Sequence, residues 1–429
     1  MDNSLRIQKL SEINRTHPYM TGIRIRYKGI STPYNAFLIP LEFLIYNKYN
    51  GRIGSLVKSY EIQNHTLDAE NPEDSASIEE FLWNSKPDRN KTTMESLVRE
   101  GQKIFGIVTS NGTIIDGNRR AMLLNKIYRE REIWEKDKHN VDHCKYFIAV
   151  ILPEDADPKE VIKLETTYQM GEDEKLGYNP IEKYLRCKDL KEIYDYNEVD
   201  IATMMVEEKS TISEWLEIMK LMDSYLEYLG YGGIYTRLDK REGQFVDLNR
   251  YLKRYSNINK TNFVEWAYDD MDVTELKCVC FDYIRAQYEG KDFRLLAQPG
   301  KNSFFCKEKV WEKFKSDHEE VINRIQEQPV EDFRKENPNA DLTKLLEARD
   351  NDWKNTVEDL FKQNYFQANH LLDNINDKDK PYELVKRAYD TLNSINTDIE
   401  SFYTPEVNGW LRKINSLAYE YCKLIKHKK

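Results

Sequence analysis

The sequence predicts an α+β N-terminal domain that is followed by all-α middle and C-terminal regions. Alternating apolar residues at 23–27 and an apolar run at 146–152 are typical of strands. Asn111-Gly112, between two short apolar runs, predicts a hairpin because tight hairpin turns need positive φ angles. From Pro158 onward the apolar residues recur at helical spacing. We therefore predict three domains, at 1–157, 158–235 and 236–429.

The composition fits a folded protein of several domains. The chain has 429 residues, of which 40% are hydrophobic and 12% aromatic. No apolar run approaches the ~20 residues needed to cross a bilayer, and the N-terminus lacks an apolar signal core. We therefore expect a cytoplasmic protein with no membrane contact, and its six scattered cysteines as free thiols. The net charge of -10 means that DNA contact requires a local basic patch.

The predicted elements of the N-terminal domain follow in order along the chain. Ile23, Ile25 and Tyr27 alternate with polar residues, as in a half-buried strand. The polar residues between 64 and 90 predict a long loop, which makes up most of an insertion at 60–93. A short helix then ends at Gly101. Further strands are expected at 105–108, 113–115 and 146–152, and a further helix at 121–127.

The segment Asp116-Gly117-Asn118-Arg119-Arg120 joins a predicted strand to a predicted helix. Such a turn presents backbone N–H groups at a helix N-terminus, where an anion is favoured. Gly117 allows close approach of a ligand, and Asn118 is expected to cap the helix. Arg119 and Arg120 supply guanidinium groups that suit phosphate oxygens. The segment therefore predicts a phosphate site.

Three stretches resemble motifs of the ParB/sulfiredoxin superfamily, in the family's order. The first runs from Ile39-Pro40-Leu41 to Arg52. The second is the helix that ends at Gly101, the hairpin and the Gly-x-Arg-Arg turn. The third combines 164–169 with 178–182 and is similar to the family's Glu-Asn-x-x-Arg and Asn-Pro-x-Glu stretch. The first half of the chain is therefore identified as a ParB/sulfiredoxin-like domain.

This resemblance implies a bound nucleoside triphosphate (CTP or ATP) and Mg²⁺ as cofactors. It implies a metal contact for Glu165. In an enzyme, an NTPase or a nuclease, Glu165 and Asp116 are the expected catalytic residues, with Glu172 nearby. The residues expected to contact phosphate are Arg52, Gly117, Asn118, Arg119 and Arg120.

The chain also departs from the family's pattern. Thr166 stands where the family has asparagine, and Gln169 where it has arginine. Both changes weaken an expectation of nucleotide hydrolysis. Asn118 takes the place of the cysteine of the sulfiredoxin branch, which argues against sulfinic acid reduction.

The family's nucleotide domain is followed by a helix-turn-helix, and 198–205 with 210–219 occupy that place here. The resemblance implies DNA contacts for Ser210, Thr211 and Ser213. Between 197 and 220, however, two basic residues stand against six acidic ones, which suits phosphate poorly. Two interpretations of this segment therefore remain: an element that binds DNA, and a scaffold that no longer binds DNA.

The next stretch, 236–260, holds seven basic residues against three acidic ones. Aromatic residues lie among them, and basic residues among aromatics suit nucleic acid through phosphate contact and base stacking. The alternative is an amphipathic helix with a solvated basic face. The DNA-contact candidates of this stretch are Arg250, Lys253 and Arg254, and the neighbouring aromatic residues are Tyr235, Phe245, Tyr251 and Tyr255.

These observations favour a nucleoside-triphosphate-binding switch protein that is associated with DNA, in phage defence or in a mobile element. One alternative is a metal-dependent nuclease or an NTP-using phosphotransferase. Another is a non-enzymatic interaction protein whose nucleotide site has decayed. The residues after 260 resemble no known motif and are compatible with a protein partner or a homodimer.

Overall fold

A computed structural model describes residues 1–28, 30–136, 139–154, 156–171, 179–256, 264, 266–300, 302–338, 340–376 and 381–427. It divides into two compact units, Met1–Ala368 and Asn369–Lys429. The predicted boundaries at 157/158 and 235/236 stay predictions. Glu172, Tyr178 and Lys260 lie outside the described residues.

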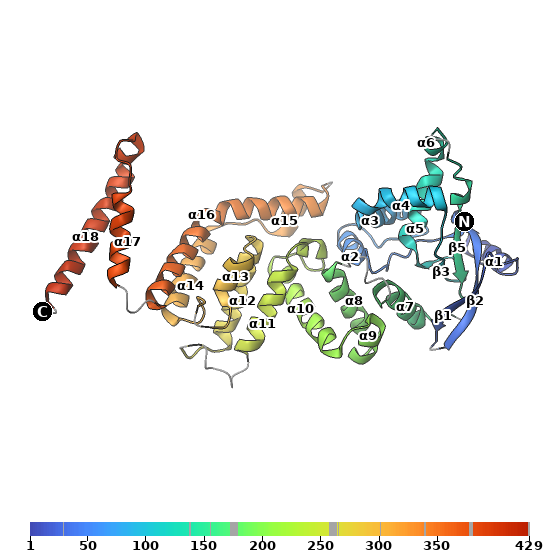
Figure 1. Cartoon of the computed structure of the whole chain (residues 1–429), viewed down its shortest axis with the longest axis horizontal. Coiled ribbons are helices and arrows are strands. Elements are labelled where there is room, and N and C mark those ends of the chain that lie inside the picture. The colour runs from blue at the N-terminus through green and yellow to red at the C-terminus, as the bar shows by residue number, and fades with distance from the viewer. Residues whose placement is uncertain are drawn as a thin grey trace. The chain divides into compact units, whose positions relative to one another are not determined.

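Five strands form one mixed sheet in the N-terminal part of the first unit (Figure 1). The order is β1-β2-β5-β3-β4; β3 runs parallel to β5, and the other pairs are antiparallel. Helices make up most of the rest, so the α+β domain followed by all-α regions is confirmed. The strands are β1 (Met20–Tyr27), β2 (Ile30–Pro40), β3 (Gly106–Val108), β4 (Ile114–Asp116) and β5 (Tyr146–Ile151).

The burial of the strands follows their place in the sheet. In β1, at the sheet edge, Ile25 and Tyr27 are buried whereas Arg24 and Arg26 are exposed. β5 lies in the middle and is covered on both faces. Phe147 packs into one hydrophobic cluster and Ile148 into the other, which explains the continuous apolar run.

The polar stretch 64–90 is mostly helical, so the expectation of a long loop was wrong. Asn71 caps α3 with Pro72 in the first turn, which is a strong start signal. Ile78 and Leu82 of this helix are fully buried, and the polar residues cover its outer face. The helices of this part are α1 (Asn3–Ile13), α2 (Gly54–Gln63), α3 (Pro72–Asn84), α4 (Pro87–Glu100), α5 (Asn118–Arg129) and α6 (Arg131–Lys136).

The rest of the first unit is helical. The expected pair of helices at 198–219 is present as α9 and α10, and the chain turns between them at Val206, which has a left-handed φ of 56°. The expected core residues Ile201, Ile212 and Leu216 are buried there. The helices are α7 (Pro158–Thr166), α8 (Pro180–Glu192), α9 (Glu198–Met205), α10 (Lys209–Tyr228), α11 (Glu242–Tyr255), α12 (Asp270–Arg285), α13 (Gly290–Ala297), α14 (Glu308–Arg324), α15 (Val330–Glu336) and α16 (Leu342–Asn376), with a short 3-10 turn, η5 (Tyr235–Leu238).

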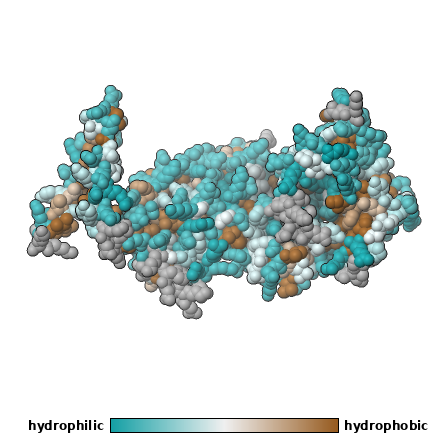
Figure 2. Space-filling model, viewed as in Figure 1, coloured by the Kyte–Doolittle hydropathy of each residue, from teal (hydrophilic) through white to brown (hydrophobic). Residues whose placement is uncertain are grey.

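The second unit contains the end of α16, then α17 (Pro381–Asn393) and α18 (Pro405–His427). Large apolar side chains of α17 and α18, such as Tyr382 and Trp410, are exposed. Elsewhere the visible surface is mostly hydrophilic, with small separate apolar patches (Figure 2). Across the described residues, no helix combines the length and apolarity that a membrane span requires.

The connection from β4 to α5 depends on Gly117. Its φ is 96°, in the left-handed region that favours glycine. A Cβ at this position would lie 2.7 Å from Cζ of Phe147, a fully buried ring of the central strand. The turn therefore leaves no room for any side chain.

We predict that Gly117→Ala lowers the free energy of unfolding by about 2–5 kcal/mol, from left-handed strain and overpacking against Phe147. Chemical denaturation of both proteins measures this. The matched control is Gly243→Ala in α11, where a Cβ meets no atom within 4 Å. That variant should be as stable as wild type or up to about 1 kcal/mol more stable. Equal stability of the two variants would contradict the tight packing at Gly117.

Candidate functional site

A cavity of about 680 Å³ opens at the turn between β4 and α5. Its walls come from that turn, from α4 and from the segment that precedes α2. The structure thus brings Arg52 together with the predicted turn Asp116–Arg120, although they are distant in sequence. Among the described residues that line this basic cavity, Asp116 is the one with an acidic side chain, and five have basic side chains: Arg52, Arg89, Lys103, Arg119 and Arg120.

Arg119 is fixed from α4. Its Nε donates a hydrogen bond to Oδ1 of Asn90 at 2.9 Å, and a terminal nitrogen lies 3.5 Å from the hydroxyl of Thr93. Burial lowers the pKa of Arg119, and the nearby positive charges of Arg52 and Arg89 lower that pKa further. Guanidinium groups that repel one another favour an anion between them.

Lys86, directly before α4, belongs to the same basic cluster. Burial is the largest cause that lowers the pKa of Lys86. The positive charges of Arg52, Arg89 and Arg119 lower this pKa further. Sequence reasoning missed Lys86, Arg89 and Lys103. The available signal was the cluster of basic residues in 86–91 of the supposed loop, which lies in sequence just before the helix of the recognised motif.

Arg120 is oriented differently from Arg119. It donates to the backbone oxygens of Ile104 and, at 3.1 Å, of Phe105. Its other terminal nitrogen lies 3.7 Å from the carboxylate of Asp116. These contacts hold Arg120 along the rim of the cavity, with its charge partly balanced by Asp116.

Asn118 does not cap α5, which corrects the sequence prediction. Gly117 is the N-cap residue, and no side chain caps the helix. The amide of Asn118 is buried instead: its Oδ1 accepts from the backbone N–H of Asn47 at 2.9 Å, and its Nδ2 donates to the oxygen of Ile114 at 2.9 Å. Because first-turn N–H groups have no partner within a helix, the uncapped end of α5 suits an anion.

Glu165 does not line the basic cavity. It is only 1% exposed, and its carboxylate lies 3.2 Å from a terminal nitrogen of Arg186. Burial raises the pKa of Glu165, whereas Arg186, the Gly51 N–H and the Asn47 side chain act to lower it. Gln169 does line the cavity, and its side chain donates to the oxygen of Ile115 at 3.0 Å.

These carboxylates do not form a preassembled metal site. Among the described residues, no group of three or more His, Cys, Asp or Glu side chains could hold a metal ion. Asp116 is the carboxylate that faces the cavity, and Glu165 is neutralised by Arg186. Since Mg²⁺ takes few protein ligands when phosphates supply oxygens, Asp116 alone still fits such an ion.

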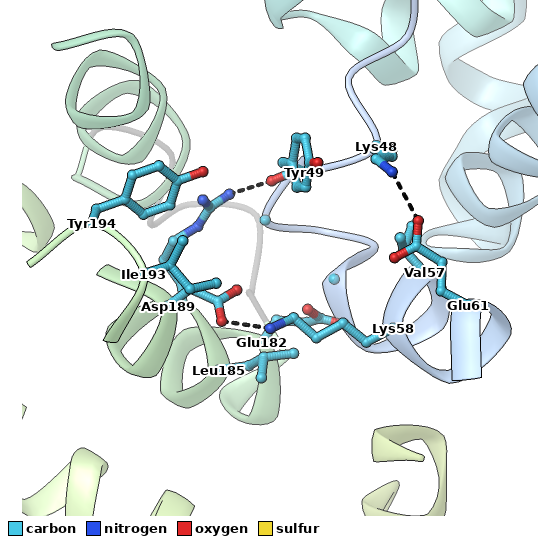
Figure 3. A pocket seen from close by; sticks show the side chains of 13 residues that line it. Lys48, Tyr49, Val57, Lys58, Glu61, Glu182, Leu185, Asp189, Ile193 and Tyr194 are labelled. Atoms are coloured by element: carbon cyan, nitrogen blue, oxygen red, sulfur yellow. Dashed lines mark hydrogen bonds and ion pairs between the residues drawn. The ribbon is translucent and has the colours of Figure 1, made fainter. Parts of the chain in front are cut away.

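A second cavity, of about 350 Å³, lies between the segment 48–61 and α8 (Figure 3). Its charges are paired: Lys48 lies 2.9 Å from Glu61, and Lys58 lies 2.5 Å from Asp189 (Figure 3). Glu182, from the predicted Asn-Pro-x-Glu stretch, accepts hydrogen bonds from the backbone and hydroxyl of Ser55. This cavity therefore lacks the excess charge of the basic cavity, and Glu182 joins α8 to the start of α2.

The predicted DNA-contact residues lie on two helices, α10 and α11. Ser210, Thr211 and Ser213 are in the first turns of α10, where the Ser213 hydroxyl donates to Glu198 at 2.6 Å. On α11, Arg250 lies 3.5 Å from Asp247, and Lys253 pairs with Glu217. Base stacking in this stretch is ruled out because its aromatic side chains are buried, namely Tyr235, Phe245, Tyr251 and Tyr255.

The buried carboxyl of Glu182 predicts a pH dependence. Burial raises its pKa above the ordinary 4.5, so the folded protein holds this proton more tightly than the unfolded chain. That contribution to stability is complete below pH ~4.5 and is lost as pH rises through the folded pKa. Urea unfolding of wild type and of Glu182→Gln at pH 4 to 8 measures this effect. We expect the free energy of unfolding of wild type, relative to that of the variant, to fall as the pH rises. A difference that rises with pH would refute the raised pKa.

No family model matches the chain, and no curated protein matches it. Among solved structures, it is similar to the C-terminally truncated chromosome-partitioning protein ParB from Caulobacter crescentus complexed with CTP-gamma-S, at 14% identity and a TM-score of 0.18. The similarity covers 50% of this chain and 92% of that chain. Because this TM-score is low, the residues of the basic cavity, and not the similarity, have to support a function.

Proposed function

We propose that the chain binds a nucleoside triphosphate in the basic cavity and acts as a nucleotide-dependent switch. The observation that carries this proposal is the convergence of five basic side chains on the uncapped end of α5. The volume of about 680 Å³ lies within the range of roughly 300–1,000 Å³ of small-molecule sites. The motif resemblance of the turn supports the same ligand class.

Each part of the cavity has a role in this proposal. The backbone N–H groups of the first turn of α5 and the guanidinium of Arg119 receive the phosphate oxygens. Arg52 approaches from the segment before α2, and Arg89 from α4. An anion placed among these groups relieves the repulsion that lowers the pKa of Arg119.

Mg²⁺ is the expected companion of a triphosphate. It would neutralise phosphate charge and fix the phosphate geometry. Asp116 would hold it from the rim of the cavity, together with phosphate oxygens. Glu165 would have to exchange Arg186 for the metal, so a catalytic or metal role for Glu165 requires a rearrangement of α7 or α8.

The first prediction of this proposal concerns Arg119 and Arg120. Wild type should be stabilised by at least one of CTP, ATP, GTP and UTP with Mg²⁺, because a ligand that binds only the folded state raises stability, by about 2.7 kcal/mol at 100 times its Kd. Arg119→Ala plus Arg120→Ala should abolish that shift. Thermal unfolding and isothermal titration calorimetry measure both effects.

The matched control is Arg24→Ala plus Arg26→Ala, which removes the same charge from exposed positions of β1. It should keep the nucleotide response of wild type. Equal nucleotide binding by the Arg119/Arg120 variant and wild type would overturn the proposal. No response of wild type to any nucleotide would favour the interaction protein with a decayed site.

A second prediction tests the contribution of the insertion. Arg89→Ala should weaken nucleotide binding by about tenfold to a hundredfold, since a hydrogen bond to a charged group contributes roughly 1.5–3 kcal/mol. Lys91→Ala is the control, because Lys91 is an exposed residue of the same helix that does not line the cavity. Titration calorimetry at low and high salt should show the loss for Arg89 alone. Equal affinities of the two variants would remove α4 from the site.

DNA association is a further part of the proposal and derives from the resemblance. Fluorescence anisotropy with duplex DNA, with and without nucleotide, tests it. Single alanine variants of Arg250, Lys253 and Arg254 on α11 test whether this helix contacts the DNA.

A further inference from the structure

We propose a second ligand site in the helical part of the first unit, which binds a small carboxylate through Arg241. A cavity of about 500 Å³ lies there between η5, the start of α11, the connection from α12 to α13, and α16. Arg241 lines it, directly before α11. The site lies at the start of the basic stretch 236–260 and is independent of the nucleotide proposal.

Arg241 is a buried cation that forms no ion pair with a carboxylate of the described residues. It is 8% exposed, and one terminal nitrogen donates to the backbone oxygen of Arg237. Its Nε is buried without a hydrogen-bond partner. Within the described part of the chain, no carboxylate forms an ion pair with it.

The nearby carboxylates are already used by other arginines. Asp350 lies 2.6 Å from Arg237 and 2.9 Å from Arg285, and it also accepts from the Tyr231 hydroxyl at 2.8 Å. Glu327 is held by Arg285 and Arg349. Three arginines thus share two carboxylates, so this network offers no spare carboxylate to Arg241. A buried charge without a partner is costly, so an anion from solvent fits here.

The lining restricts the kind of anion. Its buried polar lining residues are Arg237, Arg241 and Gln244, and Arg237 is paired with Asp350. Its exposed charged lining residues are three acidic ones, Asp239, Glu289 and Glu347, and one basic one, Lys240. This net negative rim disfavours DNA and nucleoside triphosphates. It suits a small ligand whose carboxylate pairs with Arg241 and whose amine faces the rim, as in an amino acid.

The decisive comparison is between wild type and Arg241→Met. Removing an unpaired buried charge with a side chain of similar length should raise the melting temperature in chloride buffer, because no ion pair is lost. Replacing chloride by acetate at equal ionic strength should raise the melting temperature of wild type by about 2 °C or more and leave Arg241→Met unchanged. A panel of amino acids should then give larger shifts, again only with Arg241 present.

Two controls make the result specific. Arg324→Met removes an exposed arginine of α14 and should keep the acetate response. Arg119→Ala plus Arg120→Ala should keep it too, which separates this site from the basic cavity. A lower melting temperature for Arg241→Met, with an acetate response equal to that of wild type, would overturn the proposal and make Arg241 a structural residue.

Discussion

The basic cavity depends on holding like charges close together. Arg52 and Arg89 repel Arg119, and the partial burial of Arg119 strengthens that repulsion because water screens its charge less. Asn90 opposes it: its side chain is fully buried, donates to the oxygen of Trp83 at 2.7 Å and accepts from Arg119. One amide thus joins the end of α3, the start of α4 and the first turn of α5. Packing elsewhere in the N-terminal domain offsets the destabilisation that these neighbouring positive charges cause.

Most of the N-terminal sheet follows from local signals in the sequence. Four of the five strands, the hairpin at Asn111-Gly112 and the glycine turn at Gly117 were predicted, because alternation and positive φ are properties of short segments, whereas β2 was not predicted. The helix pair at 198–219 was likewise found from its own apolar spacing. These elements fix the fold class and one side of the basic cavity.

Features that depend on distant partners were not predictable in the same way. Asn118 was expected to cap α5, yet its amide is satisfied by Asn47, which lies 71 positions away. Glu165 was expected at a metal, yet Arg186, 21 positions on, neutralises it. Arg89 is an exposed basic residue by sequence and becomes part of the cavity only because Asn90 of the same helix contacts Arg119. Such roles require the tertiary pairing itself.

Helix α2 reaches from the basic cavity to the helical part of the first unit. It begins two residues after Arg52 of the basic cavity, and its Ser59 hydroxyl accepts from the backbone N–H of Thr236 at 3.2 Å. Thr236 also lines the cavity of Arg241. The five residue steps from Gly54 to Ser59 rise about 7.5 Å along one α-helix. α2 therefore connects the two cavities through a single rigid element, so a ligand that moved its start would also move its hydrogen bond with Thr236.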